Sequence, residues 1–245
     1  MASVKVGSAR IDENGNATGG QAGDQKNGKE VSTQSWYEHE KGWRVFRALD
    51  PVKAEKIGQA MIDACDNDNI GYDQGDRYDL FKEAKKVDFD LAAVSVPTEC
   101  DCSELVRCCC AAAGIMNLPT SGFRTGNMPD NLMASGAFME LVGDKYCKSP
   151  DYLGKGDILV TKKSGHTVVV LTYGDKYERE IVSDEGMLTI KGTNWNVRSG
   201  PGINYRSVGK LNNGDQVKRL DHEDWIPVLY DGEVRFVHRT AFAEV

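Results

Sequence analysis

The cysteines are the residues of this chain whose number and spacing most need a chemical explanation. Five of the seven lie in TECDCSELVRCCCAAAG, residues 98–114, and three of these are consecutive. Neighbouring side chains cannot all face one partner, so a disulfide framework is not expected. Structural zinc sites need two ligand pairs, and the sequence offers no second pair at the usual spacing. Nucleophilic attack is the remaining chemistry, and the thiolate is its reactive form.

The local pattern places Cys102 at the start of a helix. Asp101 followed by Glu104 three residues later is typical of a capping box. Apolar residues then recur at helical spacing as far as Gly114, where the helix is expected to end. A helix N-terminus favours negative charge and lowers the pKa of a thiol, which makes Cys102 the candidate nucleophile. Residues 108–110 lie further along this helix and are predicted to be packing residues, a role that is also the alternative for Cys102.

A cysteine nucleophile needs a histidine as base. His166 opens GHTVVVLTYG, which directly follows GDILVTKKSG, and the two segments predict two strands joined by a short polar turn. A histidine at the start of a buried strand is held rigidly, as a general base must be. The alternative is a strand-end histidine that only bonds a loop. His39 is expected at the surface among charged neighbours, and His222 and His238 fall in a separate C-terminal segment.

Four segments, in order, resemble the NlpC-type cell-wall cysteine peptidases. CDCSELV resembles the Asp-Cys-Ser-x-Leu-Val signature of that family, and KGDILV with the histidine-led strand resembles its later segment. NIGYDQGDRY, residues 69–78, resembles the tyrosine-containing segment that precedes the cysteine. A helix predicted from Asp50 to Cys65 comes before it. The resemblance covers roughly residues 50–182 and implies an α+β fold with a papain-like catalytic domain.

The resemblance also implies roles for individual residues. Cys102 would be the nucleophile and His166 the base. Tyr72 would lie beside the cysteine and help bind the substrate or the oxyanion. Asp101 and Ser103 would face the substrate at the start of the helix.

Two positions depart from the family pattern. The third polar residue of the family follows the histidine by about a dozen positions on the next strand, and it is more often a histidine. Here that position falls near Glu178, which can orient an imidazole by accepting its second N–H, and Asp175 is a rival. The glycine that usually follows Cys-Ser is replaced by Glu104, which is expected to narrow or charge the entrance to the site.

The C-terminal segment has a different pattern of short alternating strands. WNVRSGPGINYRSVGKLNNGDQV resembles the bacterial SH3-type (SH3b) module, which implies a small all-β barrel. We therefore predict a catalytic domain over residues 1–185 and a cell-wall-binding module over residues 186–245. The module carries eight basic and seven acidic residues, so the acidity of the chain belongs to the first domain. Five aromatic residues are expected to lie mostly in its core: Trp195, Tyr205, Trp225, Tyr230 and Phe236. The alternative is that one or two of them are exposed and, with Arg198 or Arg206, form a groove for wall peptide or glycan.

Composition excludes several classes of partner. The net charge of −7 gives no long-range attraction to nucleic acid or to an anionic membrane surface. The longest apolar runs are only as long as strands, so no membrane insertion is expected. The first residues lack the apolar core of a signal peptide. The expected protein is a monomer without metal or cofactor, made in a host cytoplasm and acting on bacterial peptidoglycan.

Together, the motifs and the composition predict a phage endolysin-like peptidoglycan hydrolase. The expected bond is the stem-peptide amide between D-γ-glutamate and the diamino acid, because the family favours it. An N-acetylmuramoyl-L-alanine amidase of CHAP-like type is the main rival. A non-catalytic wall-binding or phage structural protein is a second alternative, and a zinc protein, which would unfold with a chelator, is a third.

Overall fold

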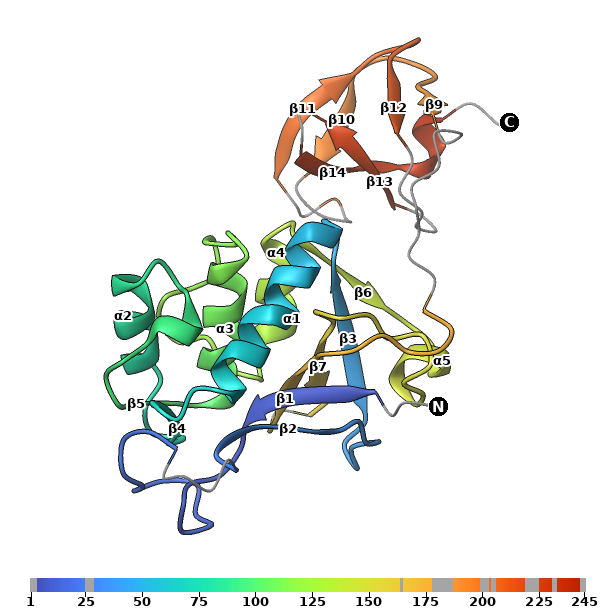
Figure 1. The fold of residues 1–245 in the computed structure, drawn as a ribbon. Coiled ribbons are helices and arrows are strands. Elements are labelled where there is room, and N and C mark those ends of the chain that lie inside the picture. The colour runs from blue at the N-terminus through green and yellow to red at the C-terminus, as the bar shows by residue number, and fades with distance from the viewer. Residues whose placement is uncertain are drawn as a thin grey trace. The chain divides into compact units, whose positions relative to one another are not determined.

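The structure is a computed structural model, and it describes residues 4–24, 29–163, 165–177, 187–198, 203, 206–218, 225–230 and 233–242. The chain divides into two compact units (Figure 1). The first comprises Met1–Leu132 and Phe138–Tyr177, and the second Met133–Ala137 and Glu178–Val245. The predicted boundary between residues 185 and 186 lies outside the described residues and stays a prediction.

The first unit is a mixed α+β structure built on a six-stranded sheet in which every neighbouring pair is antiparallel. The strand order is β2-β1-β8-β7-β3-β6. The predicted hairpin is confirmed, because β7 and β8 pair with Leu159 opposite Val168. The bounds of these strands are β1 (Lys5–Ala9), β2 (Val31–Ser35), β3 (Trp43–Ala48), β6 (Phe138–Leu141), β7 (Ile158–Thr161) and β8 (Thr167–Val170).

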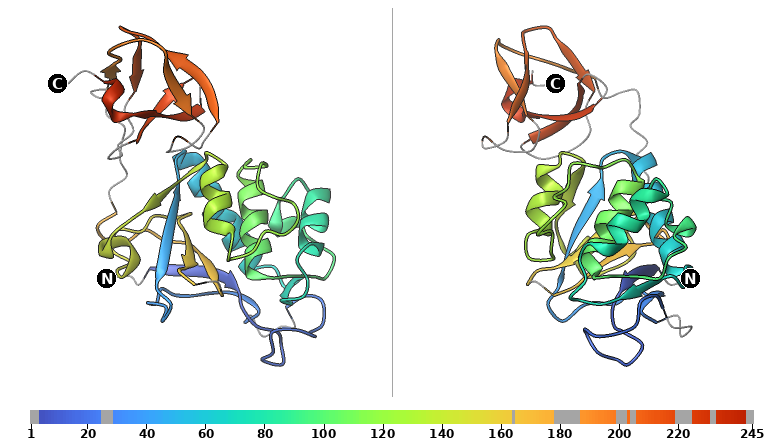
Figure 2. Two further views of the ribbon diagram at one scale, coloured as in Figure 1. Left: turned by 180° about the vertical axis from the view of Figure 1, so that it is seen from behind. Right: turned by 90° about the vertical axis from the view of Figure 1, so that its left-hand side faces the viewer.

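Helices cover one face of this sheet (Figure 2). The two that pack on it are α1 (Pro51–Cys65) and α3 (Cys102–Ala112), which contact β1 and β8 as well as each other. A two-stranded parallel sheet of β4 (Ile70–Tyr72) and β5 (Thr98–Cys100) leads into α3. The remaining helices are α2 (Asp79–Lys86), η1 (Leu91–Ala93), α4 (Met128–Ala134) and α5 (Asp144–Cys147).

The sequence signals for α1 and α3 are confirmed. The Asp50 side chain accepts a hydrogen bond of 2.8 Å from the Val52 N–H at the start of α1. The predicted apolar face of this helix is buried, with Ile57 and Met61 fully enclosed. Past the end of α3, Gly114 has a φ of 76°, the left-handed conformation that glycine adopts readily.

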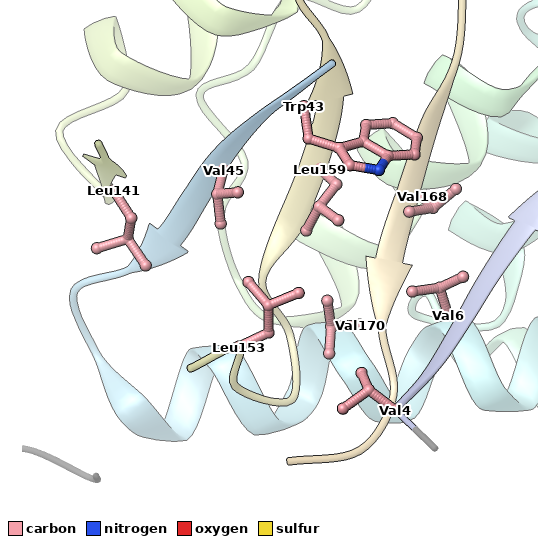
Figure 3. Packing of buried hydrophobic residues seen from close by; sticks show 9 residues of the cluster. All are labelled: Val4, Val6, Trp43, Val45, Leu141, Leu153, Leu159, Val168 and Val170. Carbon is pink, nitrogen blue, oxygen red and sulfur yellow. The ribbon is translucent and has the colours of Figure 1, made fainter. Parts of the chain in front are cut away.

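Gly7 on β1 shows which face of the sheet the helices cover. A Cβ atom at this position would lie 2.6 Å from the Met61 Cγ of α1, so the helix packs directly against the β1 backbone. Its neighbours on β1 therefore point to the opposite, outer face, because side chains alternate along a strand. An apolar cluster fills the outer face (Figure 3), formed by Val4, Val6, Trp43, Val45, Leu141, Leu153, Leu159, Val168 and Val170.

The second unit is a small β structure. A four-stranded sheet has the order β11-β10-β14-β13, and β12 pairs with β9. The predicted hairpin over residues 225–238 is confirmed by the pairing of Tyr230 with Glu233. The bounds are β9 (Met187–Thr189), β10 (Trp195–Arg198), β11 (Ser207–Leu211), β12 (Gln216–Lys218), β13 (Trp225–Tyr230), β14 (Glu233–His238) and η2 (Arg239–Ala241).

Two of the five aromatic residues expected mostly in the core of the second unit can be placed. Trp195 and Tyr230 are only half-buried, at the edge of the cluster. Aliphatic residues fill the described interior. Tyr205 and the side chains of Trp225 and Phe236 lie outside the described part. The described core consists of Ile190, Val197, Leu211, Val217, Val228, Val237 and Ala241.

Over the described residues, no helix is both long and apolar enough to cross a bilayer.

Candidate active site

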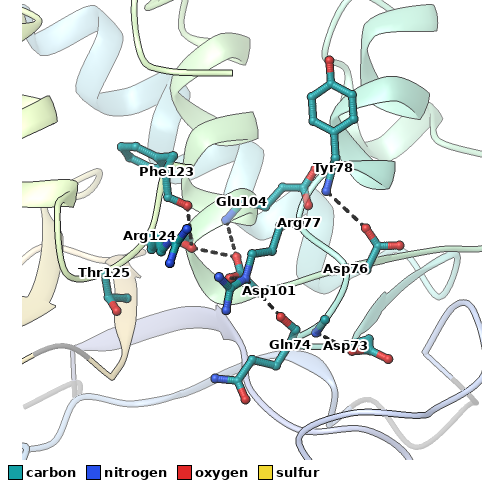
Figure 4. A network of polar contacts seen from close by, with 12 residues as sticks. Asp73, Gln74, Asp76, Arg77, Tyr78, Asp101, Glu104, Phe123, Arg124 and Thr125 are labelled. Carbon is teal, nitrogen blue, oxygen red and sulfur yellow. Dashed lines mark hydrogen bonds and ion pairs between the residues drawn. The ribbon is translucent and has the colours of Figure 1, made fainter. Parts of the chain in front are cut away.

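The start of α3 is held by a side-chain cap (Figure 4). Asp101 is the N-cap, and its Oδ1 accepts hydrogen bonds of 2.7 Å from the Glu104 N–H and from the Ser103 hydroxyl. Cys102 is the first residue of the helix, as the sequence predicted. The reciprocal half of the predicted capping box is absent, because the Glu104 carboxylate accepts the Phe81 N–H at 3.0 Å instead.

A backbone hydrogen bond brings Cys102 to the histidine strand. The Cys102 sulfur accepts a hydrogen bond from the backbone N–H of Thr167, and the N–H groups of Cys102 itself and of Ser103 also favour its charged form. Thr167 opens β8 and directly follows His166. The structure therefore brings the two principal candidates, the thiol and the histidine, to the same end of β8.

His166 is fixed at the turn between β7 and β8. Its N–H donates to the Thr161 hydroxyl at 3.1 Å, and its carbonyl accepts the Thr161 N–H at 3.0 Å. Extending the β1–β8 register, in which Gly7 lies opposite Val169, places Arg10 opposite His166. Trp43 pairs with Thr161 on the other side. One row across the outer face of the sheet thus contains Trp43, Thr161, His166 and Arg10.

The surroundings of His166 disfavour its charged form. Burial, and then the positive charges of His39 and Arg10, lower the pKa of His166 to about 4. His39 is therefore not the isolated surface residue that the sequence suggested. Its ring is half-buried and meets Trp43 edge-on, with centroids 5.1 Å apart. The chain from β2 to β3 crosses the sheet here, and this crossing could not be seen in the local sequence.

The expectation of a lowered thiol pKa is wrong for Cys102. Burial, and then the negative charge of Asp101, raise the pKa of this thiol to about 12. The three backbone donors lower it without compensating for these effects. Near neutral pH, both the Cys102 thiol and the His166 imidazole are therefore neutral in the resting protein.

Two tyrosines lie close enough to Cys102 to interact electrostatically with it. Tyr72, predicted beside the cysteine, has its N–H bound to Glu30 Oε2 at 2.9 Å. Burial raises the pKa of Tyr72, and the Cys102 thiolate raises it further. Burial likewise raises the pKa of Tyr37, while Arg10 lowers it and Cys102 raises it. The sequence reasoning missed Tyr37, although its place among aromatic residues that need burial was a usable signal.

The predicted third residue is not brought to His166 by the described residues. Glu178 lies outside them. Its rival Asp175 is exposed and lies five residues beyond Val170, the last residue of β8, whereas His166 precedes the first. The strand that adjoins β8 is β1, from the start of the chain, rather than a strand that follows it.

Asp101, Ser103 and Glu104 all take part in holding α3. The Ser103 hydroxyl also lies 3.3 Å from the Phe123 carbonyl, and Ser103 and Asp101 are buried. Their predicted contact with substrate stays a prediction. Glu104 is 2% exposed and pairs with Arg107 at 3.3 Å, so its predicted place at the entrance is wrong. Burial raises its pKa to about 8.

The other cysteines are consistent with packing. All seven cysteines are free thiols, and residues 108–110 are fully buried, as predicted. Burial raises the pKa of each of these three thiols well above its ordinary value. Within the ranges that the structure describes, no group of three or more His, Cys, Asp or Glu side chains could hold a metal ion.

Comparison with known proteins gives two family matches. A model described as an endolysin-like domain matches residues 6–177. A model described as a bacterial SH3 domain matches residues 192–242. No curated protein matches the chain.

Proposed function

The chain belongs to the endolysin-like domain family, and from this premise we propose that it hydrolyses an amide bond in the stem peptide of bacterial peptidoglycan. The two family matches together indicate a cell-wall hydrolase with a wall-binding SH3 module. The observation that carries the catalytic proposal is the hydrogen bond from the Thr167 N–H to the Cys102 sulfur. It joins the start of the cysteine helix to the histidine strand, as an NlpC-type, papain-like arrangement requires.

In the proposed reaction, Cys102 attacks as its proton moves to His166. A neutral imidazole can accept this proton, and a lowered pKa keeps His166 neutral near pH 7. The sulfur adds to the amide carbon, and backbone N–H groups at the start of α3 stabilise the oxyanion, with the Tyr72 hydroxyl as a further donor. His166 then protonates the leaving amine. It next activates a water molecule, which hydrolyses the thioester and regenerates the thiol.

The bond we propose is the amide between D-γ-glutamate and the diamino acid. The protein would reach it from a host cytoplasm, as a monomer. An N-acetylmuramoyl-L-alanine amidase would use the same two residues, so the fragments must distinguish the two activities. Release of the intact stem peptide from the glycan would identify the amidase. Fragments that begin at the diamino acid would identify the endopeptidase.

The test is digestion of a panel of purified peptidoglycans, analysed by mass spectrometry. Wild-type protein and Cys109→Ala are expected to release the same new fragments, whereas Cys102→Ala releases none. His166→Ala is expected to be slower than wild type by about 10²–10⁴-fold. Identical fragments from wild type and Cys102→Ala would rule out Cys102 as the nucleophile.

A non-catalytic wall-binding protein is favoured by one observation, the neutral state of both groups. A thiol with a pKa of about 12 is not a preformed nucleophile. Co-sedimentation with peptidoglycan, which measures binding without cleavage, distinguishes the non-catalytic hypothesis from the hydrolase. If wild type and Cys102→Ala both bind every wall tested and neither cuts any, the chain is a binding or structural protein.

A further inference from the structure

Two arginines border the cap of α3 without a role in the proposed reaction. Arg77 follows β4, and Arg124 lies in the segment between α3 and α4. We infer that Arg77 and Arg124 bind a carboxylate of the stem peptide next to the bond that Cys102 attacks. This inference rests on the proposed function and adds a determinant of substrate choice to it.

Arg77 presents a guanidinium group that is only partly used. Its Nε lies 2.9 Å from Asp101 Oδ2 and 3.1 Å from the Gln74 carbonyl. These contacts fix the side chain next to the residue that precedes Cys102. The side chain is nevertheless 41% exposed, and over the described residues its two Nη groups make no hydrogen bond.

Arg124 approaches the same cap from another segment. The preceding residue, Phe123, accepts the Ser103 hydroxyl, and the following residue, Thr125, accepts the Gly165 N–H at 3.1 Å. The segment therefore bridges the start of the cysteine helix and the turn before His166. The Arg124 side chain is exposed, and its guanidinium has no partner among the described residues. Figure 4 shows Arg77 and Arg124 bordering the Asp101 cap.

The nearby carboxylates are already engaged by the backbone. Asp73 Oδ1 accepts the Gly75 N–H at 2.5 Å, and Asp76 Oδ1 accepts the Tyr78 N–H at 3.2 Å. Asp101 pairs with Arg77 at its Nε, and the Nη groups of Arg77 make no hydrogen bond among the described residues. Arg77 and Arg124 thus present guanidinium N–H donors at one rim of the cap.

The chemistry of the guanidinium group selects the ligand. Its planar fork of donors matches a carboxylate and binds it through charge-assisted hydrogen bonds. A γ-linked glutamyl residue carries a free α-carboxylate close to its side-chain amide. The diamino acid on the other side of that amide carries a second carboxylate. Replacing either carboxylate by a carboxamide removes the charge and preserves the shape.

The test measures binding, so that it does not depend on catalysis. Cys102→Ala protein is titrated calorimetrically with L-alanyl-γ-D-glutamyl-diaminopimelate and with two analogues. One analogue has the glutamyl α-carboxylate amidated, and the other has the diamino-acid carboxylates amidated. The unmodified peptide is expected to bind about 10-fold to 100-fold more tightly than one of the two amidated analogues. The analogue that binds weakly shows which carboxylate the arginines recognise.

Two further substitutions in the Cys102→Ala protein locate the binding group. Arg124→Gln is expected to bring the acid-to-amide ratio close to one, and Arg77→Gln to reduce it. Because Arg77 also holds Asp101, Arg124→Gln is the decisive variant. Lys56→Gln removes an exposed charge from α1 and is expected to leave the ratio unchanged.

The outcomes separate this inference from the proposed function. If the acid preference persists in the double variant Arg77→Gln and Arg124→Gln, or if acid and amides bind equally, the inference is wrong. If wild type cleaves no peptide but the preference is present and requires Arg124, the proposed function fails and the carboxylate site stands. Loss of binding to all peptides in Lys56→Gln as well would mean that net charge alone acts, which also overturns the inference.

Discussion

The start and the interior of α3 contain chemically identical side chains in different surroundings. Cys102 at the first position is 8% exposed, and Cys109 in the interior is fully buried. Burial raises the pKa of both thiols, so exposure and acidity do not separate them. The difference lies in the partners. Cys102 receives backbone N–H groups from its own helix and from β8, whereas Cys109 is surrounded by apolar residues and other thiols. The backbone donors, and the link through Thr167 to the strand that His166 precedes, therefore distinguish the candidate nucleophile.

The strongest way to break this comparison is to remove each thiol separately. Cys102→Ala is expected to reduce the rate of fragment release by at least about 10⁴-fold, because it removes the proposed nucleophile. Cys109→Ala is expected to keep the rate within a few-fold. It should lower the free energy of unfolding by about 1–2 kcal/mol, because it leaves a small cavity. Release rates and urea unfolding measure the two effects, and a large loss of activity in folded Cys109→Ala would contradict the comparison.

The next test concerns His166, the proposed base for Cys102. His166 has its pKa lowered to about 4, so the imidazole stays neutral and competent down to that pH. The acid limb of kcat/KM is therefore expected near pH 4. A histidine with an ordinary pKa of about 6.5 would lose roughly thirty-fold of its activity by pH 5.

The same lowered pKa has a consequence for stability with a definite sign. The unfolded chain binds a proton at His166 below about pH 6.5, whereas the folded protein does so only near pH 4. This group therefore stabilises the fold above pH 6.5, and the stabilisation is lost as the pH falls through that window.

Replacing His39 by Gln removes one positive neighbour of His166 and should move the acid limb of kcat/KM to higher pH. An acid limb at pH 6 or above in wild type would show that His166 is not desolvated.

The smallest expected effect comes from removing the N-cap side chains of α3 and α1. Asp101→Ala and Asp50→Ala each remove an N-cap side chain and are expected to cost about 1 kcal/mol of unfolding free energy. Only Asp101 holds the helix turn that carries the nucleophile, so only Asp101→Ala should also slow fragment release, by several-fold. Thermal unfolding and release rates are measured on both variants. Equal loss of activity in both would mean that the cap of α3 has no special role.

Local features of this fold could be predicted from the sequence because they depend on nearby residues. The cap at Asp50, the start of α3 at Cys102 and the hairpin that ends at His166 each follow from a few adjacent positions. The same is true of the packing role of residues 108–110, which follows from helical spacing.

The missed features depend on which distant strand adjoins β8. Arg10, Tyr37 and His39 act on the site because β1 pairs with β8 and the chain then crosses the outer face. No local pattern specifies that pairing. The direction of the Cys102 pKa shift was missed for a related reason. The helix terminus is a local effect, but the desolvation that outweighs it comes from tertiary packing.

The position of β1 also determines when the site can form. The histidine strand lies between β7, its near neighbour in sequence, and β1, whose Lys5 N–H donates to the Thr172 hydroxyl across a separation of 167 residues. Contacts between such distant residues pay a large loop-closure cost and form slowly during folding. The pairing of β1 with β8 next to His166 is therefore expected to form late, after the α1–α3 pair and the β7–β8 hairpin. Nascent or partly folded chains would contain the nucleophile and the base before they could use them.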